Sequence, residues 1–262
     1  MKSLNLVCAV LAIFTINQLR AQSYELAWSD EFEHEISRYW TYDVGDACDK
    51  PAGCGWGNKE RQWYQPDNAT VEDGVLKITA KFDGKYTSTR MKTQGLKSFI
   101  YGRIEARMQI PSYGGSFPAF WMLGENIEEV GWPACGEVDI MEHVNVENKT
   151  HGNIHYRPDT VDYGNNGGSS AEFDVTDYHI YRVDITPETI TWYIDEEQFH
   201  QVNIKDGING TEEFHNPKFI ILNHAVGGNW PGWDIEFEKL PASFNIDYVR
   251  VYQIDDYPVF EE

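Results

Sequence analysis

The sequence RIEARMQI, residues 103–110, alternates charged or polar residues with apolar ones along its whole length. Successive side chains of a β-strand point to opposite faces of its sheet. The alternation therefore predicts one strand with a polar face of Arg103, Glu105, Arg107 and Gln109 and an apolar face of Ile104, Ala106, Met108 and Ile110. We expect the apolar face to pack in the core. The polar face is either a solvated outer surface or part of a binding site.

Similar short segments recur along the chain between turn residues, and helical periodicity is nearly absent. The clearest are GVLKITAKF (74–82), GEVDIM (136–141), YHIYRVDIT (178–186), TITWYID (189–195), KFIILNHAV (218–226) and FNIDYVRVYQ (244–253). Many short strands at this spacing predict an all-β fold, a sandwich of two antiparallel sheets. No repeat or linker divides residues 22–262, so we expect them to form a single domain.

The first 21 residues are typical of an export signal. Lys2 supplies a basic start, residues 4–16 are an apolar run, and Ala21 is the small residue at the end of a cleavage site. The run is shorter than a membrane-spanning helix requires. We expect cleavage after Ala21, secretion to the periplasm or the outside of the cell, and no membrane span.

The charge balance excludes some classes of partner. Acidic residues outnumber basic ones 42 to 21, which gives a formal net charge of −21. Such a chain repels nucleic acid and sulfated polysaccharides. Aromatic residues are 14% of the sequence and include nine tryptophans, whose rings stack well on the apolar faces of sugars. This composition favours an uncharged carbohydrate as the partner. We expect the protein to be a monomer.

Residues 22–262 contain three cysteines, Cys48, Cys54 and Cys135. In an exported protein, Cys48 and Cys54 can close the loop CDKPAGC as a structural disulfide. Cys135 would then be an unpaired, buried thiol. The sequence alone leaves the pairing open.

The segment GEVDIMEH, residues 136–143, places three acidic side chains within six residues of an otherwise apolar strand. Alternation puts Glu137 and Asp139 on one face. Unbroken alternation would send Glu142 into the core, where an unpaired carboxylate is very costly. We therefore predict a β-bulge at Ile140–Met141 that returns Glu142 to the acidic face.

This spacing has a chemical consequence. With the bulge, Glu137 and Glu142 are equivalent to four residues apart, about 13 Å between Cα atoms. Twist and leaning side chains bring the carboxyl groups within reach of the separation of about 5–5.5 Å that retaining glycosidases use. Three neighbouring acids cannot all ionise freely, so at least one pKa rises, which leaves a proton donor beside an ionised nucleophile.

Two other interpretations of the acidic strand are a calcium site and an acidic surface. Calcium ligands usually come from irregular loops with interleaved Gly or Asn. Here the residues between the acids are Val, Ile and Met. The segment therefore favours catalysis.

The six residues 137–142 resemble the E-x-D-x-x-E signature of glycoside hydrolase family 16. Segments that look like members of the family occur in the expected order: WSDEF, GNKERQWYQPDNATVEDGVLKITA, YGRIEARMQIP, FPAFWMLG, GWPACGEVDIMEHV, HGNIHY, ILNHAVGGNWPG and IDYVRVYQ. The resemblance implies a β-jelly-roll sandwich with a concave substrate cleft and no cofactor for catalysis. It also implies Glu137 as nucleophile, Glu142 as acid/base and Asp139 as their assistant.

The resemblance extends to substrate-binding positions. Those that match family positions for binding sugar hydroxyls are Asn58, Glu105, Arg107, His155 and Asn223, and those that match stacking positions are Trp121, Trp132 and, with a weaker match, Trp230. The alternative for each tryptophan is core packing, and for His155 a structural role. Glu105 and Arg107 also share the polar face of the strand at residues 103–110, in agreement with a binding face.

Members of the family often carry a calcium ion far from the cleft. Glu31, the Gly74 carbonyl and Asp247 match its ligand positions. The resemblance thus implies a structural calcium that ties the two ends of the chain together.

The segments GWPACGEVDIME and AVGGNWPG look most like the laminarinase branch, which implies an endo-acting enzyme on β-1,3-glucan. Mixed-linkage β-1,3-1,4-glucan is the alternative, because the CDKPAGC insertion near Asn58 departs from the laminarinase pattern. Agarases and carrageenases share the bulged signature, but the acidic charge argues against sulfated galactans. A non-catalytic glucan-binding protein is a further alternative. Such relatives typically lose one of the two glutamates, and both are present here.

Overall fold

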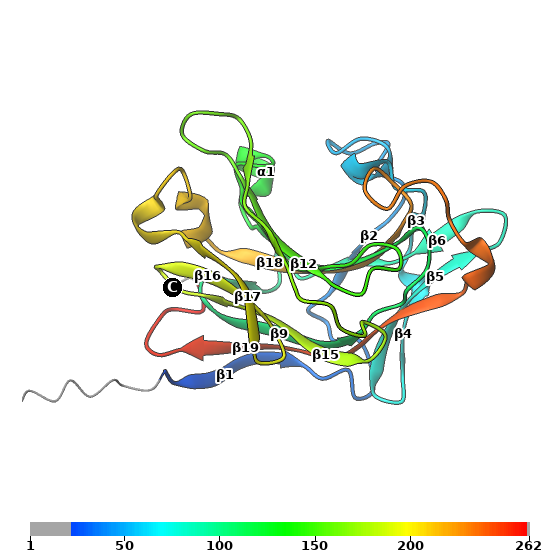
Figure 1. The fold of residues 1–262 in the computed structure, drawn as a ribbon, viewed down its shortest axis with the longest axis horizontal. Helices are drawn as coiled ribbons and strands as arrows, with labels where there is room; N and C mark the ends of the chain where they lie inside the picture. The colour runs from blue at the N-terminus through cyan, green and yellow to red at the C-terminus, as the bar shows by residue number, and fades with distance from the viewer. Residues whose placement is uncertain (1–21, 261–262) are drawn as a thin grey trace, which may run out of the picture.

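Two β-sheets packed face to face make up most of the computed structural model, which describes residues 22–260 (Figure 1). One sheet has ten strands and the other nine, and nearly all neighbouring strands are antiparallel. The predicted all-β sandwich is therefore confirmed. The predicted export signal at residues 1–21 lies outside the described residues.

The strands and short helices have the following bounds. The ten-stranded sheet runs in the order β17 (Glu197–Asn203), β16 (Thr189–Ile194), β15 (Tyr178–Ile185), β9 (Gly102–Gln109), β19 (Ala242–Ile254), β5 (Val75–Phe82), β6 (Tyr86–Ser88) and β3 (Trp63–Tyr64), with β1 (Tyr24–Asp30) beside β19 and β4 (Ala69–Glu72) beside β5. The nine-stranded sheet runs in the order β13 (Gly164–Asn165), β12 (His151–Tyr156), β11 (Glu137–Glu142), β10 (Ser116–Gly124), β18 (Lys218–Val226), β7 (Arg90–Lys92) and β2 (Thr41–Asp43), with β14 (Gly168–Ser169) beside β12 and β8 (Ser98–Phe99) beside β18. The helical segments are η1 (Gly55–Lys59), η2 (Pro66–Asn68), α1 (Ile127–Val130), η3 (Lys205–Gly207), η4 (Glu212–His215) and η5 (Phe237–Lys239). Within residues 22–260, every helix is too short to cross a bilayer.

The core lies between the two sheets and follows from the alternation of each strand. In β9, Ile104, Ala106 and Met108 are fully buried in the main hydrophobic cluster, as predicted. Phe120 of β10 and Trp192 of β16 join the same cluster. Removing this apolar surface from water contributes roughly 25 cal/mol per Å², which stabilises the face-to-face packing.

The predicted β-bulge in β11 is confirmed. Phe120 pairs with Met141, but the next residue of β10, Trp121, pairs with Asp139, so Ile140 has no partner there. Ile140 and Met141 both lie in the main core cluster. The extra core residue turns Glu142 back to the outward face that Glu137 occupies.

The nine-stranded sheet curves so that its outward face lies on the inside of the curve (Figure 1). The loop after β12 and the segment around α1 rise above this face on one side, and η1 rises on the other. Near η1, a Cys48–Cys54 disulfide closes the predicted loop, while Cys135 is a buried free thiol. The curved face therefore lies between two raised walls.

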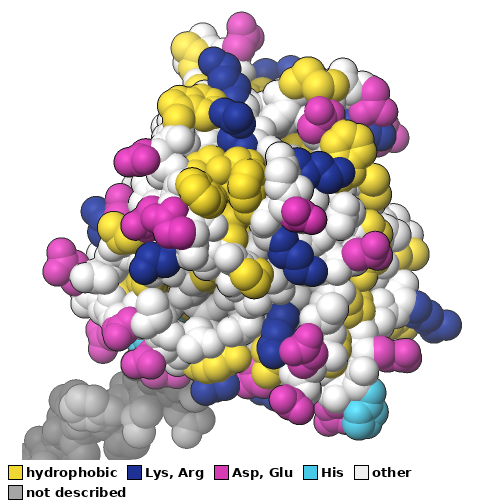
Figure 2. All heavy atoms as spheres, turned by 90° about the vertical axis from the view of Figure 1, so that its right-hand side faces the viewer, with side chains coloured by type: hydrophobic (Ala, Val, Ile, Leu, Met, Phe, Trp, Pro, Cys, Tyr) yellow, Lys and Arg dark blue, Asp and Glu magenta, His cyan; other side chains and the backbone are white. Residues whose placement is uncertain are grey.

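The β5–β6 hairpin and η5 form one end of the molecule, and hydrophobic and charged side chains are interspersed on that side (Figure 2). The ring of Phe82 lies 4.7 Å from that of Tyr86 and 5.6 Å from that of Phe237. These three rings therefore pack the hairpin against η5.

Candidate active site

Three carboxylates lie along β11 on the curved face. Glu137 and Glu142 are partly exposed, whereas Asp139 is only 2% exposed. No lysine or arginine in residues 22–260 forms an ion pair with any of them. A cluster of acidic groups without a lysine or arginine partner is a candidate for chemistry.

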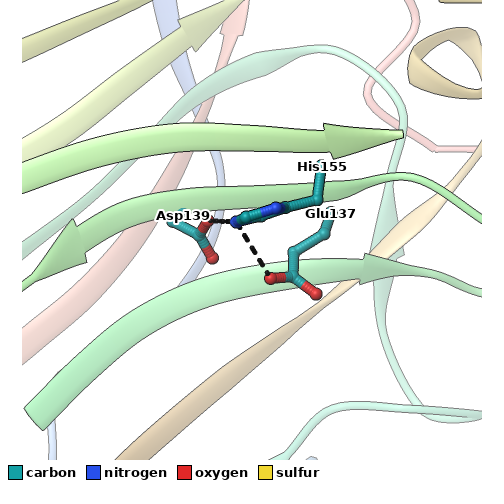
Figure 3. Close-up of side chains that lie close together, drawn as sticks. All are labelled: Glu137, Asp139 and His155. Carbon is teal, nitrogen blue, oxygen red and sulfur yellow. Dashed lines mark ion pairs between the residues drawn. The ribbon is translucent and has the colours of Figure 1, made fainter. Parts of the chain in front are cut away.

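Glu137 has two aromatic neighbours. The Trp132 indole N–H donates a hydrogen bond to Glu137 Oε2 at 2.9 Å. On β12, His155 lies directly opposite Glu137 in the strand pairing. Its Nε2 atom is 3.2 Å from Asp139 Oδ2 and 3.8 Å from Glu137 Oε1 (Figure 3). Glu137 is thus held from one side by an indole and faces an imidazole on the other.

Burial sets the protonation of the two glutamates. Desolvation, followed by repulsion from Asp139, raises the pKa of Glu137 to about 8, and the same two causes raise the pKa of Glu142 well above its ordinary value. His155 and the Trp132 hydrogen bond act in the opposite direction on Glu137. Glu142 has no such counterweight, only the additional repulsion from Glu137. His155 and Trp132 therefore favour the ionised form of Glu137, whereas the charged neighbours of Glu142 favour its protonated form.

Tyr163, in the loop after β12, orients His155. The Tyr163 hydroxyl and His155 Nδ1 are 2.8 Å apart, and the two rings stack with an interplanar angle of 23°. The Trp132 ring lies 5.5 Å from Tyr163. Desolvation lowers the pKa of His155, but Asp139 and Glu137 outweigh it, so the pKa is raised overall. This aromatic group forms one wall beside the carboxylates.

A hydrogen-bonded network lies on the other side of β11. The Trp121 indole donates to Asn223 Oδ1 at 2.7 Å, and the Asn223 amide donates to the Tyr64 hydroxyl at 3.3 Å. Tyr64 in turn donates to Glu60 Oε2 at 2.9 Å, and Asn58 donates to Glu60 Oε1 at 3.4 Å. The structure thereby brings together the predicted residues Asn58, Trp121 and Asn223.

Arg90 on β7 completes this side. Its guanidinium carbon lies 4.7 Å from the centre of the Trp121 ring and 5.0 Å from that of Trp56. Desolvation raises the pKa of the partly buried Glu60, and the positive charge of Arg90 partly offsets this. Trp121 is thus fixed by a hydrogen bond at its edge and a cation over its face.

Trp230 lies at the opposite end of β11. Its ring is 5.0 Å from that of His151, whose partner in the strand pairing is Glu142. The side chain is 46% exposed, so it is a surface aromatic and not a core residue. Aromatic rings therefore border the carboxylates at both ends of the strand.

Comparison with known proteins identifies the family to which this chain belongs. Residues 57–250 match the family described as Glycosyl hydrolases family 16. Over 256 residues, the chain is 38% identical to a β-glucanase of Rhodothermus marinus, covering 89% of this chain and 87% of that protein. The chain belongs to glycosyl hydrolase family 16.

Two further proteins are similar to this chain. A laminarinase from Flavobacterium sp. UMI-01 has a crystal structure with a TM-score of 0.78 and 38% identity, covering 87% of this chain and all of that one. The clotting factor G alpha subunit of Tachypleus tridentatus is 47% identical over 236 residues. That match covers 88% of this chain, which spans only about a third (34%) of the clotting factor. The predicted jelly roll is confirmed, and the chain is a glycoside hydrolase.

Two predicted sugar-binding residues do not join the family 16 site. Glu105 and Arg107 lie on β9, in the ten-stranded sheet, and their side chains point away from the core on the opposite side of the sandwich from β11. Arg107 forms an ion pair with Asp247 at 2.8 Å. This prediction was wrong because alternation shows which residues share a face but not which sheet the face belongs to.

The residues expected to bind calcium are engaged with arginines. Both oxygens of Glu31 accept hydrogen bonds from Arg250, at 2.9 and 2.8 Å, and Asp247 Oδ2 accepts one from Arg107. Calcium needs six to eight oxygen ligands, so these side chains do not fit the ion as they stand. The calcium site at Glu31, Gly74 and Asp247 stays a prediction.

Sequence reasoning missed Tyr163, Arg90 and Glu60. Glu60 lies two residues from Asn58 in the family-like segment GNKERQWYQ, which was a usable signal. Arg90 and Tyr163 lie in segments with no recognisable pattern. Their roles follow from contacts between residues far apart in the chain.

Proposed function

We propose that the chain is a secreted, endo-acting, retaining β-glucanase that hydrolyses β-1,3-linked glucan. The observation that carries this proposal is the pair Glu137 and Glu142 on one outward face of β11. The contacts of Glu137 favour its ionised form, whereas those of Glu142 do not. Glu137 receives a hydrogen bond from Trp132, and Glu142 has only acidic neighbours among its charged groups. One carboxyl is therefore suited to act as a nucleophile and the other as an acid.

In the first step, Glu142 donates its proton to the glycosidic oxygen as the bond to the leaving sugar breaks. Glu137 attacks the anomeric carbon and forms a covalent glycosyl ester. The ionised Glu142 then takes a proton from water, whose oxygen attacks the same carbon and releases Glu137. Two displacements give net retention of configuration. Burial, followed by repulsion from Asp139, raises the pKa of Glu142 and so favours the protonated acid before the first step.

An uncharged glucan suits the surroundings of the carboxylates. Trp121, Trp132 and Trp230 border the site, and Trp132 and Trp230 are 53% and 46% exposed. Their rings are available to stack on sugar faces. The formal net charge of −21 disfavours sulfated polysaccharides. The family 16 laminarinase relatives support β-1,3-glucan among the uncharged polymers.

The substrate is tested by incubating the protein with laminarin, barley mixed-linkage glucan and agarose in parallel and analysing the products. We expect short oligosaccharides to be released fastest from laminarin. A strong preference for barley glucan would retain the mechanism and change the specificity. The Cys48–Cys54 loop, near Trp56 and Asn58 on one side of the site, would then be the segment to exchange.

Export is part of this proposal. The apolar run at residues 4–16 and the disulfide between Cys48 and Cys54 both suit a protein made for an oxidising compartment. N-terminal sequencing of protein recovered outside the cytoplasm is expected to begin at Gln22. A chain that begins at Met1 would contradict export by cleavage.

A further inference from the structure

Glu137, Asp139 and His155 bring three metal-binding atoms together. One carboxylate oxygen from each acid and one imidazole nitrogen all lie within 4.8 Å of one another. His155 Nε2 is 3.2 Å from Asp139 Oδ2 and 3.8 Å from Glu137 Oε1 (Figure 3). Ligands at about 2.1 Å from a tetrahedral zinc ion are roughly 3.4 Å from one another. The two separations from His155 are close to that value.

A buried oxygen without a hydrogen bond points into this group. Asp139 is 2% exposed, and its Oδ2 atom makes no hydrogen bond within residues 22–260 despite its closeness to His155. The neighbouring Asn153 has the same feature, since its Oδ1 atom is buried without a partner while its Nδ2 atom is 3.1 Å from His155 Nε2. A half-turn of the Asn153 amide would present a fourth ligand oxygen. Buried polar atoms are rarely left without hydrogen bonds, yet among the described residues the Asp139 oxygen has only its ion-pair contact with His155 and the Asn153 oxygen has no partner.

Tyr163 supports metal binding by His155. Its hydroxyl is 2.8 Å from His155 Nδ1 and is able to accept a hydrogen bond from that nitrogen. In the neutral imidazole, a proton on Nδ1 leaves the lone pair of Nε2 free to face the two carboxylates. Metal-binding histidines usually donate their other ring N–H in this way, which fixes the ring orientation.

The ligand types select the kind of ion. One imidazole and two carboxylates suit zinc and neighbouring transition metals, whereas calcium takes six to eight oxygens. Two negative charges balance a divalent cation. We propose that Glu137, Asp139 and His155 bind a divalent transition-metal ion such as Zn²⁺, and that the bound ion blocks glucan hydrolysis by occupying Glu137. Metal binding depends only on these side chains, whereas inhibition also rests on the proposed role of Glu137.

The binding is tested by isothermal titration of chelator-treated, dialysed protein with ZnCl₂ at pH 7, without substrate. We expect one ion per chain, and an affinity lower by at least about tenfold in His155→Gln. His179→Gln is the matched control, because His179 pairs with one carboxylate, Asp195, at 2.9 Å and lies outside the site. Its zinc affinity is expected to equal that of the wild type. Titration with CaCl₂ is expected to be insensitive to His155→Gln.

The proposal is overturned if the wild type binds no zinc, if His155→Gln binds it as tightly as the wild type, or if His179→Gln loses it. Should His155→Gln fail to fold, Asp139→Asn serves the same test with the same expected loss.

In laminarihexaose hydrolysis, zinc is expected to raise KM without changing kcat, and EDTA to restore the rate. Zinc binding with unchanged hydrolysis would overturn the inhibition. If the wild type cleaves no glucan while zinc binds as expected, only the proposed function fails.

Discussion

Strands β9 and β11 both present charged residues on an outward face, but their charges have different partners. On β9, Arg103 forms two hydrogen bonds with Asp184, at 2.8 and 2.9 Å, and Arg107 pairs with Asp247. On β11, Glu137 and Glu142 have no lysine or arginine partner within the described residues. The two arginines of β9 are paired and stabilise a surface, whereas in the described part of the chain Glu137 has only His155 as a basic partner and Glu142 has none, which leaves both glutamates available for reaction.

The raised pKa of Glu137 lowers the stability of the fold at neutral pH. Burial raises the pKa of Glu137 to about 8, above the value of an unfolded chain. A carboxyl with a raised pKa contributes most below its unfolded pKa, and that contribution is lost as pH rises through the folded pKa. Ionisation of Glu137 in β11 therefore makes folding less favourable between about pH 4.5 and 8.

The largest expected effect follows from Glu137→Gln, which removes the proposed nucleophile and keeps the shape of the side chain. Turnover of laminarin should fall on the order of 10⁴-fold or more. The variant should also gain stability relative to the wild type as pH rises from 5 to 8, because the amide does not ionise. Initial rates and urea unfolding at several pH values measure both. Substantial activity, or a stability difference independent of pH, would contradict this account of β11.

Glu142→Ala tests the proposed role of Glu142 as the acid, separately from that of Glu137 as the nucleophile. Without a proton donor, laminarin hydrolysis should fall by about 10²–10⁴-fold. A dinitrophenyl β-laminaribioside needs no protonation of its leaving group, so its first step should be nearly unaffected in the same variant. A burst of dinitrophenol in rapid-mixing experiments would show this. An equal loss on both substrates would assign Glu142 another role.

Arg103→Met tests the paired side of the comparison. The bidentate ion pair is mostly buried, with Arg103 and Asp184 side chains 17% and 8% exposed. Removing the guanidinium leaves Asp184 without its partner, so the free energy of unfolding should decrease by about 1–3 kcal/mol. Laminarin kinetics should stay at wild-type values. A loss of kcat in a folded variant would show that the two sheets are coupled in function.

The smallest expected effect belongs to Arg107→Met. The Arg107–Asp247 pair has side chains 40% and 36% exposed, and exposed pairs contribute less than about 1 kcal/mol. Both KM and kcat for laminarin should be unchanged, since Arg107 lies on the opposite side of the sandwich from β11. An increase in KM would show that Arg107 contacts the substrate, which would contradict the placement of β9.

The comparison also shows where sequence reasoning succeeds. The bulge in β11 was predictable because burying Glu142 beside Ile140 has a large energetic cost. The face of β9 was predictable from alternation, but its sheet was not, because that depends on pairing with β15 and β19, strands distant in sequence. Arg90 and Tyr163 were unpredictable for the same reason. Their contacts with Trp121 and His155 exist only after the strands and loops have assembled.

The central claim is that Glu137 forms a covalent bond with the substrate. It is tested most directly by incubating the protein with a 2-deoxy-2-fluoro-β-laminaribiosyl donor that carries a good leaving group, followed by peptide mass mapping. We predict one sugar adduct per chain, attached to Glu137 and lost in Glu137→Gln. An adduct on Glu142 or Asp139 would contradict the account.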